Sequence, residues 1–599
     1  MATMTASSGT ALLQGGEWLL KPSDPTTTFT PERLTEEHRL IAQTVFDFVT
    51  GEVLPNLDRL EQKDWQLARQ LVRRCGELGL AGVDVAEAYG GLALDKVTSL
   101  IVSEGIGLGA SFSATFGAHT NLAVLPLSVF GTEAQKQKYL TRLLTGEIIG
   151  AYCLSEPGSG SDALGAKSRA VKQADGSFIL NGEKMWITNG GFADIFIVFA
   201  KVIDEGGEHF TAFIVERAFG GVSSGKEEHK MGLHGSSTTP VLLQDVRVPA
   251  ENLLGEVGKG HKIAFNILNF GRYKLGAMCA GASRHVIGES AKYAAERRQF
   301  GQPIASFGAI KHKIGEMVVR TYAAESLTYR TAGIIDARIA STPHEQTDQS
   351  AALAAFEEYA IEASIAKVVG SETLNFVLDE NIQIHGGNGF VHDYPAERHY
   401  RDARVNRIFE GTNEINRLLI PGMLARRAVK GNPPFIAAAK ALQDELLSPP
   451  AMAEEDDALL ATETRAVEAL KKAALMVFGL ALQTFGQKLT DQQEVLTFLA
   501  DICGDVYSAE SAVLRARASA ASGQTRASLH ADAARVFVND AVARVETNTR
   551  QALAAITQGD TLRTMLAGAR RLFKWTPIDT VTLRRRLADE AVQRRGYPL

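Results

Sequence analysis

The stretch Tyr152–Asp162, which reads YCLSEPGSGSD, lies where the residue pattern of this chain changes from helical to β-type. Its first residues favour a strand, and the rest form a loop of small residues. Such a loop lets the backbone approach a bound molecule closely and donate N–H groups to its polar edge. An ordinary Gly-Ser turn has the same composition, so the stretch alone predicts a boundary between two structural units rather than a function.

Short β-type runs follow this loop. The dipeptides Asp175-Gly176, Asn181-Gly182 and Asn189-Gly190 separate them and are typical of tight turns. The pattern predicts a small sheet or barrel of antiparallel character over residues 149–257. The runs lie at 177–180, 195–200, 210–215 and 241–243.

Helical patterns lie on both sides of this β unit. Apolar residues recur at three- and four-residue steps from Thr35 to about Leu144, and again from about Gly260 to Arg427. Pro-rich and acidic segments then precede an Ala-rich helical block. The fold class expected is mainly α with an inserted β domain and an extra C-terminal helical domain. The expected division is a flexible N-terminus (1–30), a helical domain (31–148), the β domain (149–257), a helical bundle (258–427), a linker (428–457) and a helical extension (458–599).

The composition excludes several classes of protein. The 599 residues include 63 basic and 69 acidic side chains, and this balance argues against nucleic acid as a partner. The four cysteines, Cys75, Cys153, Cys279 and Cys503, form no CxxC pair and suit neither a disulfide framework nor a zinc site. We expect buried free thiols in a reducing compartment and no metal site.

No segment has the length of a membrane span. The longest notable apolar run, Ala473–Leu482, has ten residues, whereas a span needs about 20. The N-terminus has no signal pattern, so the expected location is the cytoplasm. Residues 563–595 carry nine Lys or Arg and three Asp or Glu. This basic stretch can contact an anionic membrane, pack on a partner subunit or form a solvated face, and the last two are favoured together.

Two further tracts could bind a flat or phosphorylated molecule. In the tract 184–191, KMWITNGG, Trp186 could stack on a flat heterocycle or fill the core of the β domain. In the tract 296–301, ERRQFG, Arg297 could bind a phosphate or complement the dipole of the preceding helix.

The last two tracts lie in the second helical block. In the tract 383–389, QIHGGNG, the glycines allow close backbone approach, and His385 is more often structural than catalytic. In the tract 407–415, RIFEGTNEI, Thr412 or Asn413 can cap the following helix. Glu410 has apolar neighbours that would raise its pKa and make it a general base, although an exposed loop acid is an equal alternative.

The five tracts in this order closely resemble those of the acyl-CoA dehydrogenase family. The resemblance covers about residues 35–425, and the C-terminal block resembles the very long-chain branch of that family. It implies an FAD enzyme of fatty acid β-oxidation that desaturates a fatty acyl-CoA between Cα and Cβ. In this reading Glu410 accepts the α proton while a hydride passes to flavin N5. Electrons then pass to electron transfer flavoprotein.

The resemblance also implies roles for individual residues. FAD contacts are implied for Tyr152, Leu154, Ser155, Gly160, Ser161, Trp186, Ile187, Thr188, Arg297, Gln299, Gln383, Gly386, Gly387, Thr412 and Glu414, partly toward the FAD of a neighbouring subunit. Substrate contacts are implied for Ser161, Asn269, Phe270, Arg272 and Gly411. A few relatives place the base immediately before the arginine, but Gly271 stands there and cannot accept a proton.

Chain length and assembly are less fixed. The stretch Ser113–His119 matches the helix that closes the acyl tunnel, and its small residues Ala114, Gly117 and Ala118 could leave room for a long chain or serve close helix packing. Relatives with the extension are usually homodimers. The alternatives are an acyl-CoA oxidase and a non-catalytic assembly or scaffold protein, and the intact Glu410 and flavin loops argue against the latter.

Overall fold

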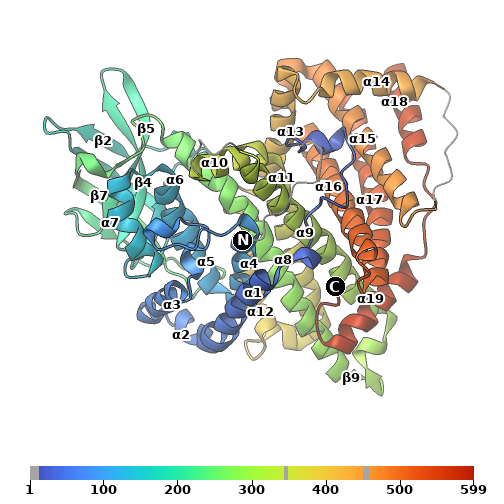
Figure 1. Ribbon diagram of the computed structural model, residues 1–599, viewed down its shortest axis with the longest axis horizontal. Coiled ribbons are helices and arrows are strands. Elements are labelled where there is room, and N and C mark those ends of the chain that lie inside the picture. Colours follow the sequence, from blue (N-terminus) through green and yellow to red (C-terminus); the bar gives the residue numbers. More distant parts are fainter. Residues whose placement is uncertain (1–11, 343–347, 449–456) are drawn as a thin grey trace.

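The computed structural model describes residues 12–342, 348–448 and 457–599. A twisted sheet lies at one end of the molecule, and long helices fill the rest (Figure 1). The fold class predicted from the sequence is confirmed: helices, an inserted sheet, a second set of helices and a helical extension follow one another along the chain.

The first helical block begins where the sequence predicted. Thr35 caps α1, because its side chain accepts a hydrogen bond from the backbone N–H of His38 at 3.2 Å. The apolar face of α1 buries Val45 and Phe48 against neighbouring helices. The block comprises α1 (Glu36–Phe48), α2 (Leu57–Glu61), α3 (Trp65–Glu77), α4 (Lys96–Ile106), α5 (Ser111–His119), α6 (Leu125–Phe130) and α7 (Glu133–Leu144).

The sheet has the order β6-β7-β3-β2-β4-β5-β8, and β1 pairs with β4 outside this path. Most pairs are antiparallel, but β1 and β2 both run parallel to β4, so the sheet is mixed rather than purely antiparallel. Alternate residues of β4 face the helices and the interior of the sheet. The strands are β1 (Gly150–Cys153), β2 (Arg169–Lys172), β3 (Phe178–Thr188), β4 (Ile195–Asp204), β5 (Gly207–Glu216), β6 (Val222–Ser224), β7 (Thr238–Val248) and β8 (Leu253–Leu254).

One predicted turn is wrong. Asn181-Gly182 lies inside β3, where the register with β7 shifts between Leu180 and Gly182. A Cβ atom at Gly182 would lie 2.1 Å from Ser168 Oγ, so this glycine permits close approach of a neighbouring segment within the sheet rather than a chain reversal.

The second helical block is built on two long helices that run side by side in the same direction. Gly276 of α8 lies against Ala366 of α11, and further along both helices the ring of Tyr293 stacks on that of His385. The block comprises α8 (Gly260–Glu296), α9 (Gly308–Ala340), α10 (Asp348–Glu358), α11 (Ala360–His385), α12 (Pro395–Ala403) and α13 (Asn413–Lys430), with a hairpin of β9 (Arg298–Gln299) and β10 (Gln302–Pro303) after α8.

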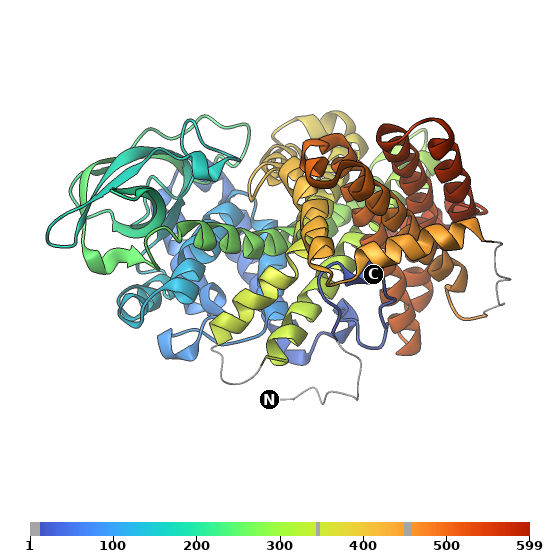
Figure 2. The same ribbon diagram turned by 90° about the horizontal axis from the view of Figure 1, so that it is seen from above.

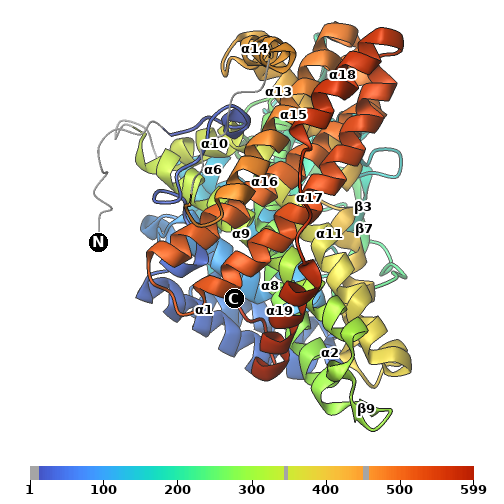
Figure 3. The same ribbon diagram turned by 90° about the vertical axis from the view of Figure 1, so that its right-hand side faces the viewer.

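The C-terminal extension shares one continuous core with this block. Buried side chains of α9, α11, α15, α16, α17 and α19 belong to the same apolar cluster. Figure 2 shows the extension at the end of the molecule opposite the sheet, and Figure 3 shows α15, α16 and α17 side by side. Its helices are α14 (Phe435–Leu447), α15 (Ala461–Phe485), α16 (Gln493–Ala521), α17 (Ala527–Ile556), α18 (Gly559–Leu572) and α19 (Thr580–Arg594).

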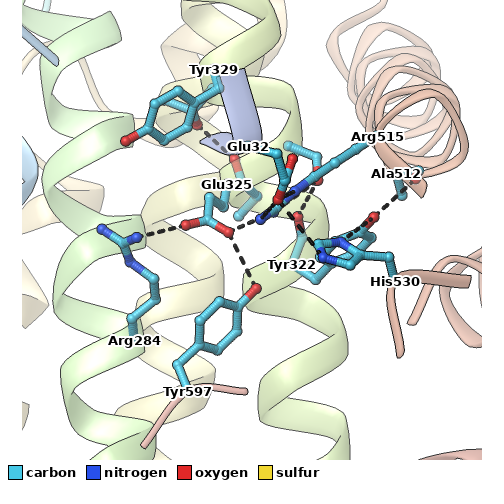
Figure 4. Close-up of polar contacts among 12 residues, drawn as sticks. Glu32, Arg284, Tyr322, Glu325, Tyr329, Ala512, Arg515, His530 and Tyr597 are labelled. Carbon is cyan, nitrogen blue, oxygen red and sulfur yellow. Dashed lines mark hydrogen bonds and ion pairs between the residues drawn. The ribbon is translucent and has the colours of Figure 1, made fainter. Parts of the chain in front are cut away.

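A buried network of charged side chains joins the extension to the helical block (Figure 4). Glu325 of α9 accepts hydrogen bonds from Arg284 of α8 at 2.8 Å and from Arg515 of α16 at 2.5 Å. Arg515 also donates two hydrogen bonds to Oε1 of Glu32, at 2.9 and 2.7 Å. Burial alone would raise the pKa of Glu32, but the charge of Arg515 outweighs it and holds this pKa at about 2.

The N-terminal segment differs from the expectation of a flexible stretch. Residues 1–11 lie outside the described residues, but residues 12–30 pack between α11 and α16. Trp18 is buried, its Nε1 donates to Glu362 Oε1 at 2.9 Å, and its ring lies 4.9 Å from that of Tyr507. These partners are distant in sequence, so the Gly- and Thr-rich composition concealed an ordered segment.

The expected linker 428–457 is also partly wrong. Residues 449–456 lie outside the described residues, but α13 continues to Lys430 and α14 occupies Phe435–Leu447. The ring of Phe435 is fully buried and lies 5.8 Å from that of Phe478 on α15. The apolar face of α14 therefore packs against α15, and this segment is a helix rather than a linker.

Most of the basic side chains in the stretch 563–595 have partners within the chain. Arg584 is buried and pairs with Glu316 and Asp540, and Arg586 pairs with Asp532 at 2.8 Å. Within the described residues, none of the helices combines the length and hydropathy that crossing a membrane requires. All four cysteines are buried free thiols.

Candidate active site

The loop after β1 and the end of β3 lie together at one edge of the sheet. The backbone N–H of Met185 donates to the carbonyl oxygen of Ser155 at 2.9 Å. Lys184 Nζ donates to Glu156 Oε1 at 2.6 Å, and both side chains are buried. This ion pair fixes the first two tracts against each other, although they are about 30 residues apart in sequence.

Trp186 does not belong to the core of the β domain. It has a φ of 59° at a register shift of β3, and 60% of its surface is exposed. The left-handed conformation is unusual for a large side chain and turns the indole outward. Ile187, the next residue, is buried and anchors the strand. The alternative of a core tryptophan is therefore wrong, and the exposed indole is free to stack on a flat molecule.

Glu410 has the environment of a general base. The residue is half-buried, but its Oε2 is inaccessible to solvent and has no hydrogen-bond partner in the described part of the chain. Burial raises the pKa of Glu410 to about 7, against the opposing charges of Arg272 and Lys367. The pKa rise predicted from its apolar neighbours is confirmed, and the carboxylate is poised to exchange a proton near neutral pH.

Three side chains hold the backbone around Glu410. Arg272 Nε donates to the carbonyl oxygen of Glu410 at 3.2 Å, Lys367 Nζ donates to that of Gly411 at 2.8 Å, and Asn416 Nδ2 donates to the same Gly411 oxygen at 2.8 Å. These bonds stabilise the left-handed φ of 59° at Glu410. Sequence reasoning missed Lys367. A lysine within the apolar run of a predicted helix was the available signal.

Gly271 leaves the space that the carboxylate occupies. A Cβ atom built on Gly271 would lie 2.6 Å from Glu410 Oε2, closer than side-chain atoms approach one another. The absent side chain therefore does more than remove an alternative base, because it lets the carboxylate lie directly on α8.

Tyr152 connects the sheet to this carboxylate. Its hydroxyl is buried without a hydrogen-bond partner among the described residues. Burial raises the pKa of Tyr152 well above its usual value, and the negative charge of Glu410 raises it further, which places the two groups within electrostatic range. The first, second and fifth tracts thus converge.

The other residues near Glu410 that were expected to contact substrate or FAD differ in their burial and hydrogen bonding. Asn269 Oδ1 accepts from Arg272 Nη1 at 2.8 Å, and Thr412 caps α13 by accepting from the N–H of Ile415 at 3.2 Å. Glu414 lies exposed in the first turn of α13. Phe270 is fully buried and its ring stacks 3.7 Å from that of Phe356, so this side chain belongs to the core.

The third and fourth tracts lie elsewhere. Arg297 and Gln299 are exposed beside the β9–β10 hairpin, which Figure 1 places far from the sheet. Gln383, Gly386 and Gly387 are exposed at the end of α11, and a Cβ atom at either glycine would meet nothing within 4 Å. The structure does not bring these residues to Trp186 within one chain. His385 is buried against Tyr293 and is structural, as the sequence favoured.

A pocket lined by Phe409, the residue before Glu410, lies between α5, α8 and α11. Met278, Leu374 and Leu378 give it apolar walls. Ser113 and Ala114 line it, but Gly117 and Ala118 are not among its lining residues, so only Ala114 of the three small residues widens this space. Sequence reasoning missed its polar lining residues, which include Asn406, His285 and His399.

The arrangement can hold a flat aromatic group against an exposed indole and remove a proton beside an apolar pocket. No cluster of three or more metal-ligating side chains occurs in residues 12–342, 348–448 and 457–599. The chain therefore presents a carboxylate base, a stacking surface and an apolar cavity as its chemical resources.

Family models match most of the chain. The "Acyl-CoA dehydrogenase, N-terminal domain" matches residues 35–147, the "middle domain" matches 151–246, and two models described as the "C-terminal domain" match 258–424 and 469–571.

Individual relatives agree with these matches. A probable acyl-CoA dehydrogenase of Bacillus subtilis (strain 168) is 47% identical over 588 residues, which cover 98% of each chain. The mitochondrial very long-chain specific acyl-CoA dehydrogenase of Rattus norvegicus is 43% identical over 57% of this chain and 51% of its own length. The crystal structure of an acyl-CoA dehydrogenase complexed with FAD from Bacillus anthracis has a TM-score of 0.95 and 47% identity. The matched region covers 98% of this chain and 100% of the Bacillus anthracis chain.

Proposed function

This chain belongs to the acyl-CoA dehydrogenase family of FAD-dependent oxidoreductases. From this premise we propose that it desaturates long-chain fatty acyl-CoA between Cα and Cβ to the trans-2-enoyl product, with Glu410 as the proton acceptor. The domain division 31–148, 149–257, 258–427 and 458–599 is part of the same proposal.

The observation that carries the proposal is the buried Oε2 of Glu410, which has no hydrogen-bond partner among the described residues. The α C–H of a thioester is a very weak acid, so its removal needs a base whose pKa is near the working pH. Burial gives Glu410 a pKa of about 7, and Gly271 leaves the carboxylate room on α8. An acyl chain whose α carbon meets Oε2 would complete the exclusion of water.

The side chains near Glu410 fit FAD. Trp186 offers an exposed indole, and the loop from Tyr152 to Ser161 is tied to the strand just before it by the hydrogen bond between Met185 and Ser155. FAD, when bound, supplies the hydride acceptor that this chain lacks. The residues proposed to hold it here are Tyr152, Leu154, Ser155, Gly160, Ser161, Trp186, Ile187, Thr188, Thr412 and Glu414.

The remote tracts support a shared cofactor site in a homodimer. Five exposed residues lie at the β9–β10 hairpin or at the end of α11, and Figure 1 places this hairpin far from the sheet whose strand β3 carries Trp186: Arg297, Gln299, Gln383, Gly386 and Gly387. The open space over both glycines suits close approach of another molecule. We assign these five residues to the FAD of a second copy of the chain.

For substrate contacts the proposal keeps Ser161, Asn269, Arg272 and Gly411. The side chain of Phe270 is left out because it is fully buried against Phe356. The apolar pocket beyond Phe409 supports a long chain, since Phe409 adjoins the proposed base in sequence and residues of α8 and α11 line the pocket.

Electron transfer flavoprotein is the proposed acceptor. A stopped-flow comparison of flavin reoxidation by that protein and by air distinguishes this proposal from an acyl-CoA oxidase. Membrane contact of the extension has less support, because Arg584 and Arg586 of its basic stretch are engaged in ion pairs within the chain.

Replacing the proposed base tests the function directly. Glu410→Gln should keep the yellow FAD-bound fold but slow flavin reduction by hexadecanoyl-CoA about 10²–10⁴-fold, since a positioned base contributes that much. In the unmodified enzyme the reduction rate should fall as the pH drops below about 7, because Glu410 then becomes protonated. The exposed Glu256→Gln variant serves as the control. Retention of more than a tenth of the original rate by Glu410→Gln would refute the assignment.

A further inference from the structure

The pocket beyond Phe409 contains buried polar groups that proton removal at Glu410 does not use. Asn406, in the short 3-10 helix Arg404–Arg407, lines the pocket and is only 6% exposed. Within the described residues, no hydrogen bond joins its side-chain amide to another group. Asn406 therefore presents a free amide to the pocket, and a purely alkyl ligand that displaced water from it would leave the amide unsatisfied.

Besides Asn406, two histidine side chains line the same pocket. The rings of His285 on α8 and His399 on α12 lie 6.2 Å apart. Glu289 lies between them, with Oε1 3.3 Å from His285 Nε2 and Oε2 3.3 Å from His399 Nδ1. Burial alone would lower the pKa of His399, but the charge of Glu289 raises it above its usual value. An imidazole carries at least one ring N–H in either protonation state, so a ligand oxygen that reaches His399 can meet a polar group.

The position of His285 along α8 places the imidazole pair near the distal part of a long chain. Met278 is seven residues and His285 fourteen residues beyond Gly271, which is roughly 10 Å and 21 Å at ~1.5 Å per residue. A staggered alkyl chain advances by roughly 1.25 Å per carbon, given carbon–carbon bonds of about 1.5 Å. A chain whose α carbon lies at Glu410 therefore passes Met278 near its tenth carbon, and its sixteenth carbon comes within roughly 4 Å of the level of His285 along α8.

Resting on the proposed function, we propose that this pocket selects acyl-CoA substrates that carry a neutral oxygen, as a hydroxyl or keto group, in the distal half of the chain. Asn406 and His399 are the residues that would hydrogen-bond this oxygen. A terminal carboxylate fits less well, because Glu289 and Asp402 already face the imidazole pair with negative charge. The apolar walls from Met278, Leu374 and Leu378 bind the methylene groups on the way.

The test measures binding separately from turnover. The FAD-bound Glu410→Gln enzyme is titrated with octadecanoyl-CoA and 12-hydroxyoctadecanoyl-CoA, and with hexadecanoyl-CoA, 16-hydroxyhexadecanoyl-CoA and the mono-CoA ester of hexadecanedioic acid. We expect each hydroxylated chain to bind about 10-fold tighter than its plain partner, because it satisfies a buried polar group. The dicarboxylic ester should bind no tighter than the plain chain.

Pocket variants then identify the groups responsible. Adding Asn406→Leu should reduce the preference for the 12-hydroxyl about 10-fold, and His399→Phe should do the same for the 16-hydroxyl. Leu378→Met, which keeps the volume of an apolar wall residue, should leave both preferences unchanged. Equal binding of plain and hydroxylated chains, or preferences that survive both polar substitutions, would overturn the inference.

The outcome is distinguishable from failure of the proposed function. On the length argument above, the eighth carbon of octanoyl-CoA lies short of Met278, and therefore short of the imidazole pair. If the unmodified enzyme reduces its flavin with octanoyl-CoA but shows no preference for distal oxygen, only the inference about the pocket is wrong. If no acyl-CoA reduces the flavin, the proposed function itself is wrong.

Discussion

Two glutamates with buried carboxylate oxygens have opposite surroundings in this chain. Glu325, at the contact between α9 and the extension, accepts from Arg284 and Arg515 and is approached by Tyr597 at 3.3 Å (Figure 4). Glu410 has no hydrogen bond to its Oε2 from any described residue, and Arg272 and Lys367 bond to the backbone around it rather than to its carboxylate.

The difference separates a structural carboxylate from the one proposed as the base. Two arginines pair with the two carboxylate oxygens of Glu325, so this side chain joins helices and has a structural role. Glu410 lacks such partners, so burial raises its pKa to about 7 and leaves one oxygen available to a substrate. The missing hydrogen bond at Glu410 reduces stability locally, and this cost is expected where a site is kept ready for a ligand.

The largest effect is expected from removing a partner of the structural carboxylate. Arg515→Met leaves Glu325 and Glu32 buried with one cation fewer, so the free energy of unfolding should fall by about 3–5 kcal/mol. Turnover per folded molecule should stay unchanged, because Arg515 lies far from Glu410 along the chain and in the fold. Urea unfolding followed by circular dichroism, with activity measured on the folded fraction, checks both.

An exposed pair gives the control for this variant. Arg563 and Asp560 form an ion pair at 2.8 Å with both side chains more than 80% exposed. Arg563→Met should change the free energy of unfolding by less than about 1 kcal/mol. If Arg515→Met lowered the free energy of unfolding as little as Arg563→Met does, the network at Glu325 would not stabilise the packing of the extension.

A smaller effect is expected from crowding the reactive carboxylate. In Gly271→Ala the new Cβ would lie 2.6 Å from Glu410 Oε2, so the carboxylate must move. Flavin reduction should slow about 10²-fold, the usual effect of a displacement of about 1 Å. The fold should be retained or stabilised, because alanine favours a helix over glycine by about 1 kcal/mol.

Gly288→Ala on the same helix is the matched control. Its Cβ would lie 3.4 Å from the nearest atom, the carbonyl oxygen of Arg595, which is an ordinary contact. This variant should gain the same helix stability without loss of rate. Equal rates for the two variants would show that Glu410 does not depend on the space at Gly271.

The smallest expected effect is a pH-dependent gain of stability in Glu410→Gln. The folded-state pKa of about 7 exceeds the usual value of 4.5, so the folded chain binds this proton more tightly than the unfolded chain. Glu410 therefore destabilises the native state progressively as the pH rises from about 4.5 to 7, by at most about 3 kcal/mol. Glutamine removes this cost, so the variant should gain stability over that range and keep the gain above it.

Urea midpoints of the FAD-bound proteins at pH 5, 6, 7 and 8 measure this difference. If the difference in stability between the variant and the unmodified protein shrinks as the pH rises, the raised pKa of Glu410 is contradicted. Glu410 would then be an ordinary loop carboxylate.

The sequence alone determined the order of the structural units and the identity of the proposed base. Helical and β periodicities are local properties, so the start of α1 at Thr35 and the change of pattern near Tyr152 could be read directly. The apolar neighbours of Glu410 likewise predicted the direction of its pKa shift.

The errors have one physical cause. Residues 12–30 were expected to be flexible and 428–457 to be a linker, but Trp18 meets Glu362 and Phe435 meets Phe478, partners that no local pattern indicates. Asn181-Gly182 has the composition of a turn, yet the close approach of Ser168 makes it a bulge inside β3.

Only the tertiary structure decided the surroundings of each reactive group. Gly271 and Lys367 reach Glu410 from helices more than 40 residues away in sequence, and His285 meets His399 across more than 100. Burial and pKa depend on these distant neighbours, whereas a periodic pattern reports only which face of its own helix or strand is apolar. The sequence could therefore name the proposed base, but the space, the charges and the pocket around it followed from packing.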